Sequence, residues 1–242
     1  MLTRGKSQAA EAPKRFYRAA VSGEVDDGHG VLLDGRAVRT PLGKRLVLPT
    51  AALAVQLAEE WDRQGEYILI GGMHATRLAY TTLDAAADAR GPLADEVARW
   101  AGSDAICYFA DGPNTLVERE LIGWGPLLDW AHEALGLEFV RAAGVIHQGQ
   151  PPQTIERVRS LASALDDFHL TGVAMAAGLF GSAVLALALE RGRLGGEAAF
   201  DLSRLDEAFH EEQWGEDAEA AVRTARMRSE ASMLENWFRA LA

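Results

Sequence analysis

The stretch richest in reactive groups is residues 209–221, FHEEQWGEDAEAA, where acidic side chains surround one tryptophan and one glycine. Its carboxylates are Glu211, Glu212, Glu216, Asp217 and Glu219. A hydrophobic core does not accept so many carboxylates, so this acid must face water or a basic partner. Charge runs are usually solvated helix faces, and in that interpretation Trp214 is tucked inward. The alternative interpretation is a surface that recognises a basic or amide-rich partner.

Acid–base and metal chemistry have less support from residue spacing. The six histidines are dispersed, and His210-Glu211-Glu212 lacks the second histidine of a zinc-binding helix. Asp166, Asp167 and His169 are suited to acid–base chemistry, but helix capping explains the two aspartates with fewer assumptions. We therefore expect neither catalytic residues nor a metal site.

A thiol nucleophile and a phosphate site are also poorly supported. Cys107 follows Ser103-Asp104, yet no neighbouring histidine or cation is visible to activate the thiol. The chain contains no GxxxxGK[ST], GxGxxG or GxSxG motif. We expect a protein that is not an enzyme, binds no cofactor and is inert toward ATP.

Composition excludes further classes. The 242 residues carry a net charge of -11 with 48% apolar residues, which is typical of an ordinary globular protein and unfavourable for binding nucleic acid. Cys107 is the single cysteine, so an internal disulfide or a CxxC zinc site is impossible. A reducing compartment is the expected location.

The first part of the chain predicts a mobile tail at residues 1–14 and a small α+β domain at residues 15–88. Period-two alternation in RFYRAAV, VLLDGRAVRTP and KRLVLP predicts antiparallel sheet between Arg15 and Pro49. Asp34-Gly35 predicts a tight hairpin, and Leu42-Gly43-Lys44 predicts a second turn. At Pro49-Thr50 the period changes, which predicts a helix after this sheet.

That helix is expected to follow Thr50, a favourable capping residue, with Leu53, Leu57 and Trp61 on its apolar face. A further short strand is expected at Tyr67 to Ile70. Helices are then predicted at residues 76–87 and 92–101. The last of these opens the second domain.

The second domain, residues 89–242, is predicted to be an all-α helical bundle. Further helices are expected at residues 116–135, with Pro126 inside, and from Pro152 to about Leu165, whereas residues 140–146 suit a short extended piece. Residues 170–189 form an uncharged run as long as a membrane span. Its many small residues and the Gly178 to Gly181 interruption favour two short helices buried in the bundle, and no integral membrane span.

The acidic stretch joins two amphipathic helices at Gly215. Glycine suits the left-handed residue that ends a helix, and Glu216 and Asp217 then fall at the positive end of the next helix. This arrangement predicts a sharp stop and restart of the helix at that point. We refer to residues 209–221 as the acidic corner.

Eight short motifs, in order along the chain, together resemble one known family. They are RFY at 15–17, LDGR with RTP at 33–41, LPT at 48–50, AEEWDRQ at 58–64, TRLAYTTLD at 76–84, SDAICY at 103–108, LLDW at 127–130 and EEQWGEDAEAA at 211–221. The chain resembles the F1-ATPase assembly chaperones that bind the alpha subunit of ATP synthase. Three places depart from the family pattern: Met73-His74-Ala75, Phe109 and Gly125.

The resemblance implies a non-enzymatic chaperone that binds the free alpha subunit and prevents its aggregation until it pairs with the beta subunit. It implies a small α+β domain followed by a helical bundle. It also maps the family's acidic stretch onto Glu212, Trp214, Gly215, Glu216 and Glu219. With the neighbouring acids Glu211 and Asp217, these residues are the expected partner contact. A monomer in the bacterial cytoplasm, or in the mitochondrial matrix of a eukaryote, is expected.

Two other function classes remain open at this point. One is a small-molecule enzyme that uses an interdomain cleft near Asp167 and His169. The other is a structural subunit that stays in the finished complex. Stabilisation by a small-molecule ligand would indicate an enzyme. Co-purification with one protein client, or suppression of that client's aggregation, would indicate a chaperone.

Overall fold

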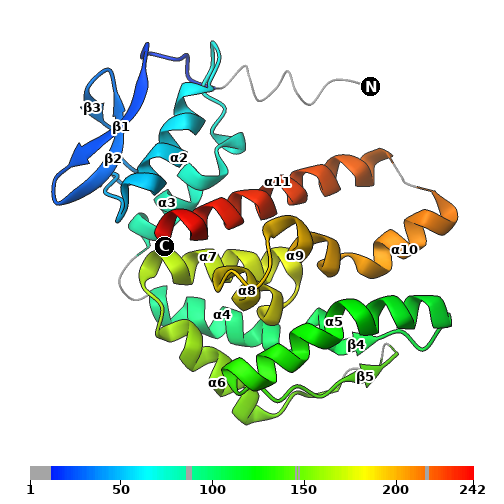
Figure 1. Cartoon of the computed structure of the whole chain (residues 1–242). Coiled ribbons are helices and arrows are strands. Elements are labelled where there is room, and N and C mark those ends of the chain that lie inside the picture. Colours follow the sequence, from blue (N-terminus) through cyan, green and yellow to red (C-terminus); the bar gives the residue numbers. More distant parts are fainter. Residues whose placement is uncertain (1–11, 86–88, 145, 147, 216–217) are drawn as a thin grey trace. The chain divides into compact units, whose positions relative to one another are not determined.

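The computed structural model describes residues 12–85, 89–144, 146, 148–215 and 218–242. These residues form two compact units, one of residues 12–85 with 239–242 and one of residues 89–238. Figure 1 follows the chain through an antiparallel sheet and its helices, and then through a mainly helical region. The predicted α+β class is therefore confirmed.

The first unit is a small sheet packed on helix α2. Its elements are β1 (Ala20–Val25), β2 (Gly28–Leu33), β3 (Arg36–Ala37), α2 (Ala51–Asp62), the 3-10 turn η1 (Ile70–Gly72) and α3 (His74–Asp84). Among the described residues the three strands pair antiparallel in the order β1-β2-β3. Helix α2 packs against β1 and β2, so its buried face completes the core of this unit.

The predicted Asp34-Gly35 hairpin is confirmed. Leu33 pairs with Arg36, and the two residues between them have φ of +47° and +82°. Both central residues are therefore left-handed, as a type I′ turn requires. The second predicted turn is also present, because Gly43 has φ +82° and donates its N–H to the Thr40 carbonyl at 2.9 Å.

Other strand predictions were wrong. Tyr67 forms only an isolated bridge with Lys14, and Ile70 already belongs to the 3-10 turn η1. The first strand begins at Ala20 rather than Arg15, because the Arg15 side chain and the Tyr17 hydroxyl bind the end of α2 instead. Leu48 likewise makes only a bridge, to His29. Contacts with residues far along the chain therefore set the conformation of the segment at Arg15 to Tyr17.

Helix α2 begins directly after Thr50, the predicted capping residue. The Thr50 hydroxyl accepts the Leu53 N–H at 3.1 Å, and Leu53, Leu57 and Trp61 are buried. Thr50 also donates to the Ala240 carbonyl at 2.6 Å. Near the other end of α2, Glu60 accepts the N–H groups of Ala75 and Thr76 at 2.9 and 2.8 Å. A carboxylate in this position satisfies the free donors at the start of α3.

The second unit is a helical bundle. Its elements are α4 (Arg90–Gly102), η3 (Ala105–Cys107), β4 (Tyr108–Phe109), α5 (Asn114–Leu135), β5 (Ala142–Ala143), α6 (Pro152–Ser163), α7 (Asp167–Phe180), α8 (Ala183–Glu190), α9 (Gly196–Ser203), α10 (Leu205–Trp214) and most of α11 (Ala218–Leu241). The last residues of α11 belong to the first unit. The expected extended piece pairs in parallel with β4. Helix α5 continues through Pro126.

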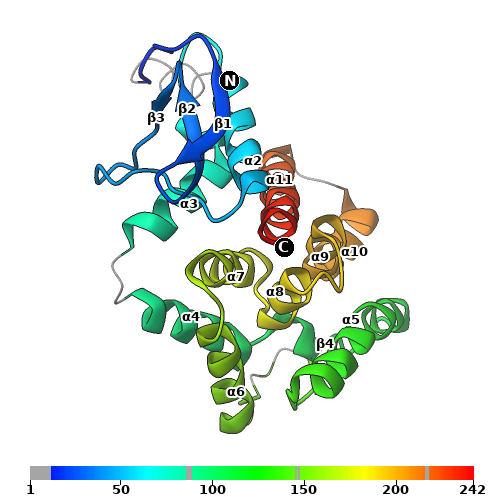
Figure 2. The ribbon, with the colours of Figure 1, turned by 60° about the vertical axis from the view of Figure 1, so that its left-hand side comes forward.

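The uncharged run at residues 170–189 folds as the two buried helices that its composition predicted. Helix α7 ends at Gly181, which has φ +63°, and α8 is buried from Ala183 to Leu189. Figures 1 and 2 both show α8 among α7, α9 and α5, and it also contacts α4. Within the described residues, none of the helices combines the length and apolar character needed to cross a bilayer.

A buried carboxyl group closes the amino end of α8. Asp104 is fully buried, and its carboxylate accepts the Val184 N–H at 3.0 Å and a hydrogen bond from Ser182. Burial raises the pKa of Asp104 to about 6, although these hydrogen bonds oppose the increase. The Ser182 hydroxyl accepts the Leu185 N–H at 3.0 Å. The first turn of α8 is thus satisfied without water.

Replacing this acceptor tests its role. Asp104→Asn should lower the free energy of unfolding by about 1–3 kcal/mol, because the amide nitrogen cannot accept a backbone N–H. Urea denaturation measures the difference. Asp111→Asn, at an exposed position of the same unit, should change stability little. Equal stabilities for the two variants would contradict the capping role.

Candidate functional site

The acidic corner begins on α10, which is attached to the bundle by few side chains. Phe209 is the buried residue of this helix, at 6% exposure. The Arg119 guanidinium of α5 lies 5.2 Å from the centre of the Phe209 ring. Arg119 also pairs with Glu212 at 2.9 Å. One arginine therefore contacts both the apolar anchor and an acid of the candidate site.

A second attachment is a pair of carboxyl groups. Glu120 of α5 is fully buried, accepts the Ala110 N–H at 2.7 Å and hydrogen-bonds with Asp206 of α10. Burial raises the pKa of Glu120 to about 7, and the hydrogen bond to Asp206 raises it further. Two carboxyl groups can share a hydrogen bond only when one of them is protonated. Below about pH 7, where Glu120 is protonated, its carboxyl group can therefore donate to Asp206 at the start of α10.

Trp214 is exposed, which corrects the interpretation that it is tucked inward as packing. The side chain is 78% exposed and stacks on His210 with 4.9 Å between ring centres and 14° between planes. Trp214 is the last residue of α10, one turn after His210, so its ring lies along the helix instead of beneath it. Val222 in the first part of α11 is also exposed, at 73%.

Gly215 ends α10 with a backbone conformation that requires glycine. Its φ and ψ are 88° and 159°. This differs from the predicted left-handed helical conformation and belongs to a region that is essentially restricted to glycine. The predicted stop of the helix is confirmed. Glu216 and Asp217 lie outside the described residues, and Glu219 belongs to the first turn of α11 while its side chain is outside them too.

Both described acids of the corner have partners within the chain. Glu211 pairs with Arg204 at 3.0 Å, and Glu212 pairs with Arg119. The hydrogen bond from Arg119 lowers the pKa of Glu212, which therefore stays ionised at neutral pH. The Glu212 side chain is 53% exposed, so it remains accessible to solvent. The corner combines ionised acid with an exposed aromatic ring.

The residues considered for catalysis have structural roles. Asp166 caps α7 by accepting the N–H groups of Phe168 and His169 at 2.9 and 3.0 Å, and its other oxygen lies 2.7 Å from Nδ1 of His169. Asp167 pairs with Arg90. Burial raises the pKa of the Cys107 thiol, which disfavours a nucleophilic thiolate. In the described part of the chain, no three His, Cys, Asp or Glu side chains gather as metal ligands would.

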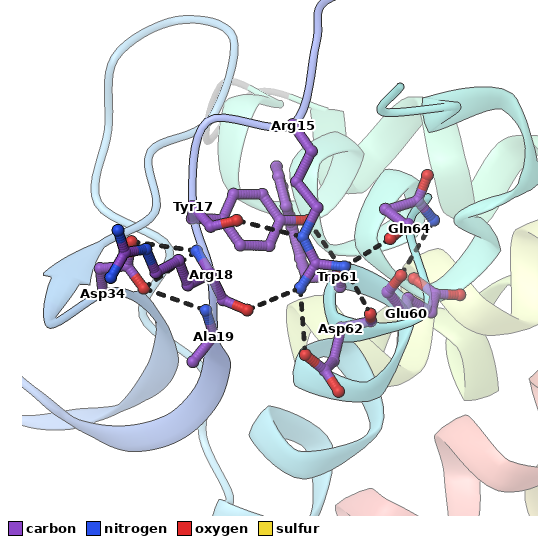
Figure 3. Close-up of polar contacts among 9 residues, drawn as sticks. All are labelled: Arg15, Tyr17, Arg18, Ala19, Asp34, Glu60, Trp61, Asp62 and Gln64. Atoms are coloured by element: carbon purple, nitrogen blue, oxygen red, sulfur yellow. Dashed lines mark hydrogen bonds and ion pairs between the residues drawn. The ribbon is translucent and has the colours of Figure 1, made fainter. Parts of the chain in front are cut away.

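Several motifs of the first unit also serve its folding. The Arg15 guanidinium donates to the Asp62 and Gln64 carbonyls at the end of α2 and to the Arg18 carbonyl (Figure 3). The Tyr17 hydroxyl donates to the Trp61 carbonyl at 2.6 Å. These contacts join RFY to AEEWDRQ, two motifs that sequence reasoning treated separately. Only the arrangement in space could show that they form one network.

Comparison with known proteins identifies the family. The family described as ATP12 chaperone protein matches residues 14–132. The solved structure of Atp12 from Paracoccus denitrificans is 35% identical, covers 96% of this chain and 100% of its own, and superimposes with a TM-score of 0.87. The chain belongs to the ATP12 chaperone family. This result confirms the resemblance to F1-ATPase assembly chaperones.

Two more relatives agree with that assignment. A solved structure from Agrobacterium tumefaciens is 38% identical, covers 95% of this chain and 87% of its own, and has a TM-score of 0.88. The mitochondrial protein atp12 of Schizosaccharomyces pombe is 26% identical over 222 residues, which is 85% of this chain and 75% of that protein. The family likeness therefore extends through both units.

The exposure of Trp214 leads to a prediction about stability. Trp214→Ala should change the free energy of unfolding by less than about 0.5 kcal/mol, because little packing is lost. Trp237→Ala, at a fully buried tryptophan, should cost about 3–5 kcal/mol. Thermal or urea denaturation of the two variants measures the contrast. A strongly destabilised Trp214→Ala protein would show that the ring packs in solution.

The Glu120 proton leads to a prediction about pH. The folded protein holds this proton up to about pH 7, whereas an unfolded glutamate releases it near the ordinary value of 4.5. The stabilisation is therefore complete below about pH 4.5 and is lost as pH rises through 7. Glu120→Gln keeps a neutral donor, so at pH 8 it should be more stable than wild type by roughly 1–3 kcal/mol. Urea denaturation at pH 5 and pH 8 should show the difference only at pH 8.

Proposed function

We propose that this protein binds the free alpha subunit of the F1 sector of ATP synthase through the acidic corner and prevents its aggregation. The observation that carries the proposal is the exposed Trp214 ring, stacked on His210 at the end of α10 and flanked by carboxylates. Exposed aromatic residues at the centre of a polar surface are frequent anchors of protein interfaces. Membership of a chaperone family supports a protein client.

The proposed client needs protection from aggregation for a physical reason. A newly made alpha subunit exposes the surface that it later offers to the beta subunit, and an exposed apolar patch of that kind aggregates. A protein that covers it reversibly and releases it to beta needs no ATP. The absence of phosphate-loop motifs from the sequence is in accord with such a mechanism.

The corner would use two kinds of contact. Trp214 would supply apolar area, and the acids would orient a basic or amide-rich surface around it. Because Arg119 and Arg204 already pair with Glu212 and Glu211, a client cation would have to share or replace these arginines. Such exchange favours reversible binding over very tight binding. Glu216, Asp217 and Glu219 would add to the negative field of the corner.

The same proposal places the protein as a monomer where alpha subunits are folded. That compartment is the bacterial cytoplasm, or the mitochondrial matrix if the protein is eukaryotic. The atp12 relative from Schizosaccharomyces pombe is mitochondrial. The single cysteine, which is free and buried, suits a reducing compartment.

Charge reversal at the corner tests the contact. Glu212→Lys and Glu219→Lys should each weaken binding of the purified alpha subunit by about 3- to 10-fold, because an attractive rim charge becomes repulsive. Glu212→Lys should keep its melting temperature within a few degrees, since an exposed ion pair contributes only about 0–1 kcal/mol. A thermal melt should verify that Glu219→Lys is folded as well. Binding is measured by titration of labelled protein with alpha subunit in the absence of beta.

A matched control separates the local effect from net charge. Glu133→Lys makes the same change at an exposed position on α5 and should leave the affinity unaltered. If all three variants bind the alpha subunit equally well, the acidic corner is merely solvated and the contact lies elsewhere. If wild-type protein binds no alpha subunit at all, the proposed client is wrong.

A further inference from the structure

The first unit contains a cavity of about 580 Å³. It lies between residues 15–19, which we call the entering segment, the β2–β3 hairpin and the end of α2. Tyr17, Leu33, Val38 and Trp61 are buried residues that line it, and Phe16, which also lines it, is 73% exposed. A volume of this size is within the range of ligand sites in proteins. The apolar and aromatic part of the lining suits an inserted side chain.

The walls of the cavity are fixed in position by hydrogen bonds. The Tyr17 hydroxyl is held by the Trp61 carbonyl, and the Asp34 carboxylate accepts the N–H groups of Arg18 and Ala19 (Figure 3). These bonds join the entering segment to both the helix and the hairpin. The two backbone hydrogen bonds lower the pKa of Asp34, so it remains an ionised acceptor. A ligand would enter a preorganised site.

Trp61 carries a polar group that lacks a partner. The residue is 6% exposed, and its indole Nε1 has no hydrogen-bond partner among the described residues. A buried N–H without an acceptor is unfavourable, and buried polar groups are nearly always paired. This nitrogen is covered by protein atoms, so a molecule in the cavity would contact the Trp61 ring rather than the N–H group.

The charged side chains that line the cavity favour an anionic ligand. Arg36 and Arg39 are exposed, although the whole chain has a net charge of -11. Asp34, the acid of the lining, is already occupied by backbone N–H groups. Arg39 donates to the Gly43 carbonyl at 2.7 Å, and Arg36 makes no ion pair within the part of the chain that the structure describes. A guanidinium in this state binds a carboxylate well.

We propose that this cavity binds a peptide segment in which a large apolar side chain stands next to an acidic residue. The apolar side chain fills the space between Phe16 and Trp61, and the carboxylate pairs with Arg36. A peptide is the occupant favoured by membership of a chaperone family, whose clients are proteins. The cavity is a different site from the acidic corner. It would bind an acidic group, whereas the corner would bind a basic one.

A defined peptide tests the specificity of the site. The probe is a fluorescein-labelled Gly-Ser-Phe-Asp-Ser-Gly peptide titrated with the full chain, with fluorescence polarisation as the readout. Replacing its Phe by Ala, or its Asp by Asn, should weaken binding at least tenfold. Failure of the parent peptide to bind at millimolar protein, or equal binding of all three peptides, would overturn the proposal.

Matched variants of the protein locate the contact. Arg36→Glu should weaken binding at least tenfold, whereas Arg77→Glu, an equal charge change at an exposed position on α3, should not. Phe16→Ser should weaken binding to a similar degree, whereas Leu42→Ser, with the same exposure at 72%, should not. All four residues are exposed, so thermal melting should verify that each variant is folded.

The indole resonance of Trp61 provides a readout at the cavity itself. In an ¹H–¹⁵N spectrum this resonance is assigned by its loss in Trp61→Phe, and it should move on addition of the peptide. Binding without that movement would place the peptide elsewhere and overturn the proposal.

Sedimentation tests whether a second copy of this protein occupies the cavity. A wild-type dimer that Phe16→Ser dissociates would assign the cavity to that second copy and overturn the peptide proposal. No alpha subunit is used, so these results are independent of the proposed function.

Discussion

Burial of helix α8 is the constraint on which the helical unit depends. Every residue from Ala183 to Leu189 is buried, so the first N–H groups of the helix cannot be satisfied by water. Asp104 and Ser182 accept two of them, and the neighbouring Ala105 N–H donates to the Gly181 carbonyl at 3.0 Å. These bonds connect the end of α4 to the turn between α7 and α8. An ionisable group is tolerated there because several hydrogen bonds offset its desolvation.

In the first unit, polar side chains likewise bind the backbone groups at the ends of helices. Glu60 accepts the N–H groups at the start of α3, and Arg15 donates to carbonyls at the end of α2. Thr40 and Leu42 both donate to the Asp84 carboxylate. Each of these polar residues lies within, or next to, a motif that carried the family resemblance. Much of that resemblance therefore reflects the folding of this unit, and motif membership alone does not indicate a binding residue.

The acidic corner differs from these regions because little of it is buried. Phe209 and the carboxyl pair of Glu120 and Asp206 lie where α10 meets the bundle, while Trp214 and Val222 are exposed to solvent. Segments with few buried contacts are drawn from the less stable parts of a protein, and such parts can adjust when a partner binds. The corner thus has the exposure that recognition requires. The Arg119 and Arg204 pairs hold Glu212 and Glu211 in defined positions.

Local interactions were accessible from the sequence by itself. The Asp34-Gly35 hairpin, the Thr50 cap, the Gly181 and Gly215 helix ends and the two buried helices of residues 170–189 all depend on neighbours a few residues away. Tertiary structure decided the rest. The strand expected at Tyr67 was lost, Trp214 is exposed instead of packed, and Asp104 caps a helix 80 residues along the chain. Residue types and spacing record local preferences, whereas burial and the pairing of a carboxylate with a distant N–H depend on which segments the fold brings together.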